Sequence, residues 1–125
     1  MNASKILVVE DEKALRTLYK QELEHDGYTV VTAEDATAGL RALEAEAPDL
    51  VVLDIRMPGV DGLDCMGRML ARRPRVSIVL NTAYSSYEDN FLSWAADAYV
   101  IKSSDTGELR AKIREVLQTR KIGHA

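Results

Sequence analysis

The fold is decided by a short stretch of sequence, LVVLD at residues 50–54. Its first four residues are apolar without alternation, which is the pattern of a strand buried on both faces of a parallel sheet. Asp54 then ends the apolar run abruptly. The same pattern occurs near the N-terminus, where KILVV at residues 5–9 is followed by Glu10 and Asp11. The two stretches therefore predict two buried strands that each end in carboxylates.

Strand and helix patterns alternate along the rest of the chain. Apolar residues recur at helical spacing after each strand, and the pair Asp26-Gly27 is typical of a helix end. Strands are expected at residues 5–9, 28–32, 50–53, 76–80 and 98–101, and helices at residues 12–26, 36–47, 63–72, 86–96 and 109–117. Residues 55–62 are expected to form a loop. Five strands alternating with five helices predict a doubly wound α/β fold with a parallel sheet of strand order 2-1-3-4-5.

Length and composition limit the class of protein. A chain of 125 residues fits one domain, expected at residues 1–120 and followed by a tail at residues 121–125. Hydrophobic residues make up 46% and charged residues 29%, which is the balance of a soluble globular protein. The single cysteine, Cys65, cannot form an internal disulfide, and no apolar run is long enough to span a membrane. We therefore expect a cytoplasmic protein without membrane contact.

The charge balance argues against direct binding of nucleic acid. The chain has 16 Lys and Arg against 20 Asp and Glu, a formal net charge of −4, whereas a binder of phosphate backbones needs a basic face. Three arginines, Arg72, Arg73 and Arg75, surround a proline between a predicted helix and a predicted strand. We interpret them as a solvated loop and not as a nucleic-acid patch.

Polar side chains follow the predicted strands at the edge where parallel sheets collect functional groups. Glu10 and Asp11 follow the first strand, Asp54 the third, Thr82 the fourth and Lys102 the fifth. In the predicted strand order the first and third strands are neighbours, so the carboxylates repel one another unless a cation joins them. These strand ends offer hard oxygen ligands without histidine or cysteine, which favours Mg²⁺.

These residues resemble those of the receiver domains of two-component response regulators, which have a flavodoxin-like fold. The resemblance extends over essentially the whole chain. Its motifs are Glu10-Asp11, LDIRMPG at residues 53–59 with DG at 61–62, NTA at 81–83, and AYVIK at 98–102. Each motif alone is weak, but four in order at this spacing indicate the family strongly.

The resemblance implies a phosphorylation site. Asp54 would accept a phosphoryl group from a sensor histidine kinase or a phosphotransfer protein. Glu10, Asp11 and Asp54, with the main-chain carbonyl of Arg56, would hold Mg²⁺. Lys102 and Thr82 would contact the phosphoryl oxygens after transfer. The chain would then catalyse only its own phosphorylation and dephosphorylation.

Further positions would surround the phosphoryl group or transmit its presence. By the resemblance, Arg56, Ala83 and Tyr84 would flank the phosphoryl group, and we expect the bulk of Tyr84 to slow hydrolysis. Thr82 and Tyr99 would form the switch, which changes the face made by residues 86–101 and the last helix. That face would control a downstream effector or a covalently linked output domain, with a phosphorylation-dependent homodimer as a further option.

Two alternatives remain open from the sequence. A binding-only pseudo-receiver is supported by Ser103, because the family has a proline joined through a cis peptide at this position. If the peptide is trans here, the reach of Lys102 is altered. An aspartate-nucleophile hydrolase of the haloacid dehalogenase kind would also use Asp54 with Mg²⁺. Such a hydrolase usually has a second aspartate two residues later, where this chain has Arg56.

Overall fold

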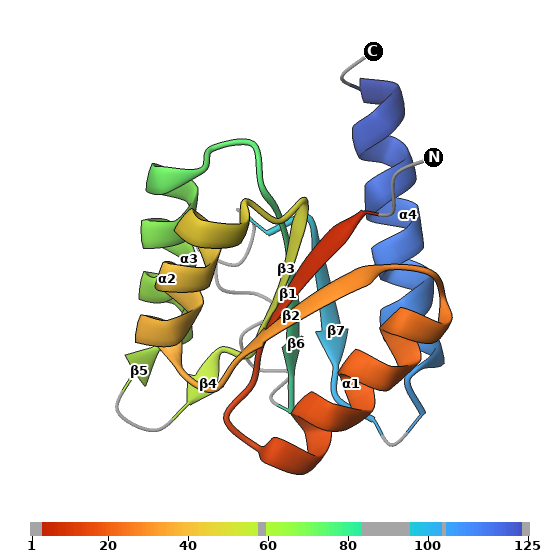
Figure 1. The fold of residues 1–125 in the computed structure, drawn as a ribbon, viewed down its shortest axis with the longest axis horizontal. Coiled ribbons are helices and arrows are strands. Elements are labelled where there is room, and N and C mark those ends of the chain that lie inside the picture. The colour runs from red at the N-terminus through yellow and green to blue at the C-terminus, as the bar shows by residue number, and fades with distance from the viewer. Residues whose placement is uncertain (1–3, 58–59, 84–95, 104, 124–125) are drawn as a thin grey trace.

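The computed structural model describes residues 4–57, 60–83, 96–103 and 105–123, in which strands and helices alternate (Figure 1). The elements in chain order are β1 (Lys5–Val9), α1 (Lys13–His25), β2 (Thr29–Ala33), α2 (Ala36–Glu46), β3 (Leu50–Leu53), β4 (Arg56–Met57), β5 (Val60–Asp61), α3 (Gly62–Arg72), β6 (Ser77–Thr82), β7 (Ala98–Ile101) and α4 (Gly107–Gly123). None of the described helices is long and apolar enough to cross a membrane.

Five of the strands form one parallel sheet in the order β2-β1-β3-β6-β7. This order confirms the predicted doubly wound, flavodoxin-like fold, since β6 and β7 are the fourth and fifth of the long strands. Val9 is paired with Leu53, and Leu53 with Leu80, so β1, β3 and β6 reach the same edge of the sheet in register. The residues that follow these strands therefore meet at that edge.

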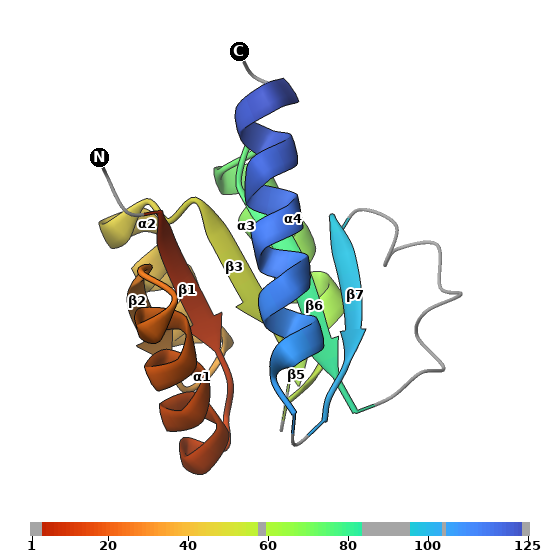
Figure 2. The same ribbon diagram turned by 90° about the vertical axis from the view of Figure 1, so that its right-hand side faces the viewer.

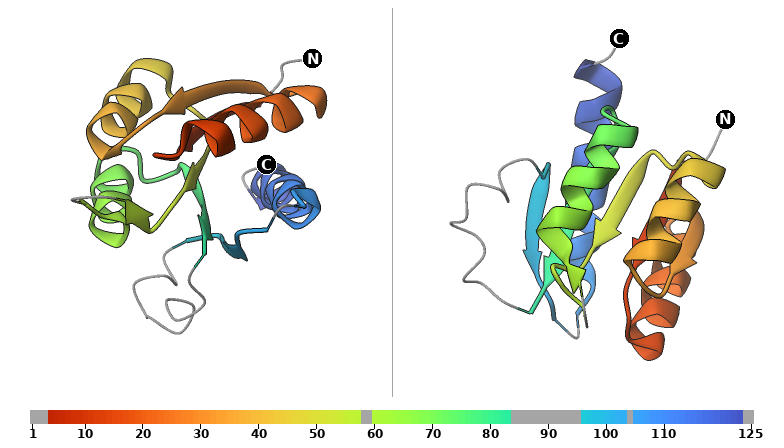
Figure 3. Two further views of the ribbon diagram at one scale, coloured as in Figure 1. Left: turned by 90° about the horizontal axis from the view of Figure 1, so that it is seen from below. Right: turned by 90° about the vertical axis from the view of Figure 1, so that its left-hand side faces the viewer.

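Helices cover both faces of the sheet (Figures 2 and 3). On one face α2 and α3 pack against Leu7 and Val9, and on the other α1 and α4 pack against Ile6 and Val8. Because both faces are covered, the central strand β3 is apolar throughout and fully buried, and it gains the hydrophobic stabilisation of two buried surfaces. Cys65 is buried within the α2–α3 side of the core, as expected for a small apolar residue, and burial raises its pKa to about 11.

The structure differs from the sequence prediction in two described segments. The segment expected to be a loop contains a short antiparallel pair, β4 with β5. The last helix, α4, runs on to Gly123 and so extends into the expected tail. The helix expected at residues 86–96, with its apolar residues Tyr87, Phe91 and Trp94, lies almost entirely outside the described residues.

Candidate phosphoryl and metal site

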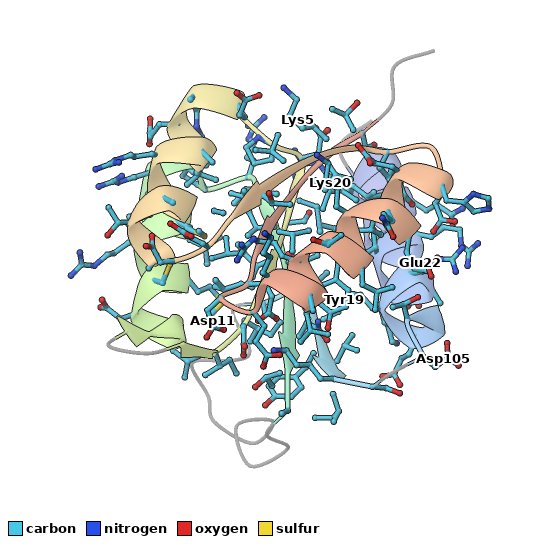
Figure 4. All side chains as sticks on the ribbon, turned by 60° about the horizontal axis from the view of Figure 1, so that its bottom comes forward. Lys5, Asp11, Tyr19, Lys20, Glu22 and Asp105 are labelled. Atoms are coloured by element: carbon cyan, nitrogen blue, oxygen red, sulfur yellow. The ribbon has the colours of Figure 1, made fainter. Side chains whose placement is uncertain are left out.

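Glu10 and Asp11 follow β1 directly, at the edge of the sheet that Figure 4 brings forward. The Glu10 side chain is buried at 2% exposure, and its Oε2 accepts a hydrogen bond from the main-chain N–H of Glu12 at 3.2 Å. Asp11 is exposed. In Figure 4 Asp11 lies near the start of α1, at the opposite end of β1 from Lys5. The pair thus offers one buried and one solvent-facing carboxylate.

Asp54 follows β3 and completes an acidic cluster. It is 5% exposed, and its main-chain N–H is directed at the carbonyl oxygen of Val9 at 3.4 Å. One carboxylate oxygen from each of Glu10, Asp11 and Asp54 lies within 4.8 Å of the others. The three carboxylates predicted from the strand ends are therefore close enough to share one ion.

Lys102 supplies the positive charge of the cluster. Its Nζ lies 2.7 Å from Glu10 Oε1 and 2.8 Å from Asp54 Oδ2, and its side chain is 14% exposed. Its main-chain N–H donates to the carbonyl oxygen of Thr82 at 2.7 Å, which holds the start of the loop against β6. No described peptide bond is cis, so Ser103 follows Lys102 through a trans bond. Lys102 nevertheless reaches both buried carboxylates.

Burial and ion pairing act against each other in this cluster. Burial raises the pKa of Glu10, and the hydrogen bonds from Lys102 and Glu12 only partly offset this effect. Burial also disfavours the charged form of Lys102, but its hydrogen bonds to Asp54 and Glu10 together outweigh burial and raise the pKa of Lys102. The ammonium group therefore stays charged and neutralises part of the negative charge.

The donor set fits a hard divalent cation. Magnesium prefers oxygen ligands and is commonly bound through one or two carboxylates, with its remaining positions open to water and phosphate oxygens. Glu10 and Asp54 are buried, whereas Asp11 is exposed on the solvent side of the cluster. These two buried carboxylates share the ammonium group of Lys102.

The structure describes most of the other predicted site residues, and they differ in burial and in their distance along the chain from this cluster. Thr82 is fully buried at the end of β6, and Ala83 follows it and is exposed. Tyr99 is half-buried in β7, where it is paired with Leu80 and packs against the α2–α3 side of the core. The main chain of Arg56 begins β4, shortly after Asp54. Tyr84 lies outside the described residues.

Gly62 is a site residue whose physical role the sequence analysis missed. A Cβ atom at Gly62 would lie 2.7 Å from the carbonyl oxygen of Asp54 and 2.5 Å from that of Ile55, closer than real Cβ contacts. The Gly62 N–H also donates to the Ile55 oxygen at 2.9 Å. Only glycine permits this approach, which fixes the chain segment that carries Asp54. The DG motif was visible in the sequence, but its contact with Asp54 was not.

Arg16 and Tyr19 of α1 also support the site. Arg16 Nη1 donates to the main-chain oxygens of Glu10 at 2.8 Å and Asp11 at 3.2 Å, so it holds the acidic loop without neutralising its carboxylates directly. Tyr19 is 3% exposed, and burial raises the pKa of its hydroxyl, an effect that the nearby Asn81 side chain, next to Thr82, partly offsets. Helical spacing alone does not indicate that Tyr19 lies near a polar side chain.

Comparison with known proteins agrees with this geometry. The response regulator receiver domain family matches residues 6–114 of the chain. The chain is 35% identical over 120 residues to the alkaline phosphatase synthesis transcriptional regulatory protein PhoP of Bacillus subtilis, and the match covers 94% of this chain and 50% of PhoP. The chain thus spans about half the length of the curated relatives it matches.

Solved structures of relatives are similar as well. The response regulator TrrA of Thermotoga maritima, in complex with Mg²⁺ and BeF, is 43% identical, with a TM-score of 0.85 and coverage of 90% of this chain and 97% of TrrA. TrrA in complex with the histidine kinase ThkA is likewise 43% identical, with a TM-score of 0.84 and coverage of 91% and 98%. Sequence, fold and site geometry agree, and the chain belongs to the response regulator receiver domain family.

Proposed function

We propose that this chain is a phosphorylation-dependent signalling switch in which Asp54 accepts the phosphoryl group. The observation that supports this most directly is the clustering of Glu10, Asp11 and Asp54 within 4.8 Å, with Lys102 in contact with two of them. The structure of TrrA with Mg²⁺ and BeF and its complex with a histidine kinase support the same chemistry and the same class of donor.

In the proposed reaction a phosphoryl group passes from a phosphohistidine of the kinase to the carboxylate of Asp54. An oxygen of the Asp54 carboxylate attacks the phosphorus of a phosphohistidine, the P–N bond breaks, and the imidazole nitrogen keeps the electron pair and takes up a proton. The product is an aspartyl phosphate, which water later hydrolyses. Glu10, Asp11, Asp54 and the main-chain carbonyl of Arg56 would hold Mg²⁺, which neutralises charge on the phosphoryl oxygens during transfer.

Lys102 and Thr82 then bind the new phosphoryl group. The Lys102 ammonium already lies 2.8 Å from Asp54, so it needs only a short movement to contact a phosphoryl oxygen. The Thr82 hydroxyl would bind a second oxygen, with Ala83, Arg56 and Tyr84 flanking the group. If Tyr84 shields the phosphoryl group from water, Tyr84→Ala will accelerate dephosphorylation.

The switch would work through the pairing of β6 with β7. Thr82 ends β6, and Tyr99 lies in β7 opposite Leu80, so a displacement of Thr82 acts close to Tyr99. Converting a mostly inactive population into a mostly active one takes about 5 kcal/mol of differential interaction, which charge-assisted hydrogen bonds to Thr82 and Lys102 can supply. The altered face would then bind an effector, an output domain or a second copy of the chain.

The test is incubation with Mg²⁺ and acetyl phosphate followed by intact-protein mass spectrometry. We expect one phosphoryl adduct that is absent in Asp54→Asn and present in the control Asp64→Asn, because Asp64 is exposed on α3 outside the acidic cluster. Release of phosphate from acetyl phosphate without an accumulated adduct would favour the hydrolase. Absence of both adduct and turnover in the wild type would favour the pseudo-receiver.

A further inference from the structure

A second concentration of charge lies at the opposite end of the sheet and consists of arginines. Arg72 ends α3, Arg73 and Arg75 lie between α3 and β6, and Arg120 extends from α4. Side chains from these separate segments line one cavity of about 400 Å³. The arginines interpreted from the sequence as a solvated loop therefore face a hollow that a fourth arginine completes.

The cavity is positively charged although the chain has a net charge of −4. Asp49 is the acidic residue among those that line it, and its Oδ2 already accepts the main-chain N–H of Lys5 at 2.8 Å. Arg73 Nη2 lies 3.9 Å from a carboxylate oxygen of Glu44. Four arginines thus line this cavity together with one aspartate, so positive charge is in excess among the lining residues.

Two of the arginines are held by neutral oxygen atoms. Arg120 Nη1 donates to the main-chain oxygen of Arg75, and it lies 3.3 Å from Ser77 Oγ. Arg73 Nη2 donates to the main-chain oxygen of Glu44 at 3.2 Å, while its Nε is buried without a hydrogen-bond partner in the described part of the chain. A buried donor without an acceptor is rare in folded proteins, and Arg73 would gain by turning toward an anion.

The residues that line the arginine-rich cavity favour a ligand with both phosphate oxygens and an organic group. Guanidinium groups bind phosphate oxygens through paired N–H donors, and the apolar side chains of Pro48, Pro74 and Val76 offer contacts for an organic group. An adjoining cavity of about 410 Å³ shares Arg75 and Arg120 but is also lined by Asp97 and Glu115, which disfavour phosphate there. Volumes of this size are typical of small-molecule sites.

We propose that the arginine-lined cavity binds a small organic molecule carrying two or more phosphate groups, such as a nucleoside diphosphate. A long polyanion is disfavoured because the protein as a whole is acidic, with a net charge of −4. The site is separate from Asp54, since the whole length of β6, at about 3.3 Å per residue, lies between Val76 and Thr82. The proposal therefore does not depend on phosphorylation.

The test is a calorimetric titration of ADP into the unphosphorylated protein, in EDTA so that no metal–phosphate complex forms at the acidic cluster. We expect saturable binding of one ADP, weaker binding of pyrophosphate and none of adenosine. Arg72→Gln and Arg75→Gln should each weaken ADP binding about tenfold, because each removes a charged hydrogen bond from an exposed side chain. The control is Arg68→Gln. Arg68 lies one turn earlier on α3 and pairs with Asp64, so this variant should bind ADP like the wild type.

Several results would overturn the proposal. One is an absence of saturable ADP binding. Another is an equal loss of ADP affinity in Arg68→Gln and Arg72→Gln, because this would indicate diffuse electrostatic attraction. Pyrophosphate binding as tightly as ADP would exclude contacts to the organic group. Binding of a DNA oligonucleotide through the same arginines without binding of ADP would replace the small ligand with nucleic acid.

Discussion

The two ends of the central sheet both carry aspartate or glutamate, but these carboxylates have different partners. Where the strands begin, Asp49 accepts the main-chain N–H of Lys5 and Asp97 accepts that of Ile78, each at 2.8 Å. Where the strands end, Glu10 and Asp54 share the ammonium group of Lys102, at 2.7 and 2.8 Å, and Glu10 also accepts the main-chain N–H of Glu12 at 3.2 Å.

This difference separates carboxylates that support the fold from those that can react. A main-chain N–H is fixed in position, so the carboxylates of Asp49 and Asp97 are committed to the strand beginnings. An ammonium group on a flexible side chain can move away and be replaced by another cation or by a phosphoryl group. The movable ammonium group that Glu10 and Asp54 share therefore distinguishes the candidate site from the strand beginnings.

Replacing Lys102 tests this comparison with the largest expected effect. Lys102→Met leaves two buried carboxylates without their cation, and we expect the free energy of unfolding in EDTA to fall by about 3 kcal/mol. Mg²⁺ should restore much of the loss and bind about tenfold more tightly, because the ammonium no longer competes for the carboxylates. Urea unfolding with and without Mg²⁺, and calorimetric titration with Mg²⁺, measure both effects.

Lys5→Met is the matched control at the other end of β1. Its side chain forms a half-exposed ion pair with Glu46 at 3.2 Å, so its loss should cost little stability and leave Mg²⁺ binding unchanged. Unchanged or weaker Mg²⁺ binding in Lys102→Met would mean that the ammonium group and the metal do not compete.

A second pair of variants tests whether the site at the ends of the strands requires a fixed main chain around Asp54. In Gly62→Ala the new Cβ would meet the carbonyl oxygens of Ile55 and Asp54, and we expect a loss of about 2 kcal/mol in unfolding free energy and weaker Mg²⁺ binding. Gly67→Ala on the same helix has open space and should stabilise the protein by about 0.5–1 kcal/mol. If urea unfolding shows equal effects for both variants, the close approach at Gly62 is not required.

The sequence sufficed for the sheet and for the acidic cluster because both depend on local patterns. Uninterrupted apolar runs marked the buried strands, and parallel pairing then placed Glu10, Asp11 and Asp54 at one edge. Lys102 was expected near Asp54, and the contact is present in spite of the trans bond to Ser103.

Features that depend on atomic contacts between distant segments could not be predicted in the same way. The bridge from Lys102 to Glu10 as well as Asp54, and the hold of Arg16 on the acidic loop, require side-chain positions that periodicity does not encode. The arginine-lined cavity brings Arg120 of α4 beside the α3–β6 loop, so the basic run alone did not indicate a hollow. Roles assigned to Arg56, Thr82, Ala83, Tyr84 and Tyr99 stay predictions.

The beginnings of the strands offer a third test with a smaller effect. Asp97→Ala removes the acceptor for the buried Ile78 N–H, and we expect a loss of about 1 kcal/mol in unfolding free energy with unchanged Mg²⁺ affinity. Asp97→Asn keeps an oxygen acceptor and should lose less. A change of Mg²⁺ affinity in Asp97→Ala would show that the two ends of the sheet are coupled.

The smallest expected effect comes from a carboxylate at neither end of the sheet. Asp26, next to the end of α1, forms two hydrogen bonds with Arg110 of α4, at 2.6 and 2.8 Å, and these bonds lower the pKa of Asp26. Its native pKa is thus below the unfolded value of 3.8, so the pair stabilises the protein fully above pH 3.8 and loses this contribution as the pH falls through the native pKa.

We expect Asp26→Asn to lower the unfolding free energy by about 0.5 kcal/mol at neutral pH, a modest value because the pair is partly exposed to water. The difference from the wild type should shrink as the pH falls below 3.8, when Asp26 takes up a proton. Glu24→Gln, an exposed position on the same helix, controls for the loss of one negative charge. A difference between Asp26→Asn and the wild type that stays constant with pH would exclude ion pairing as its cause and leave Asp26 a role in packing alone.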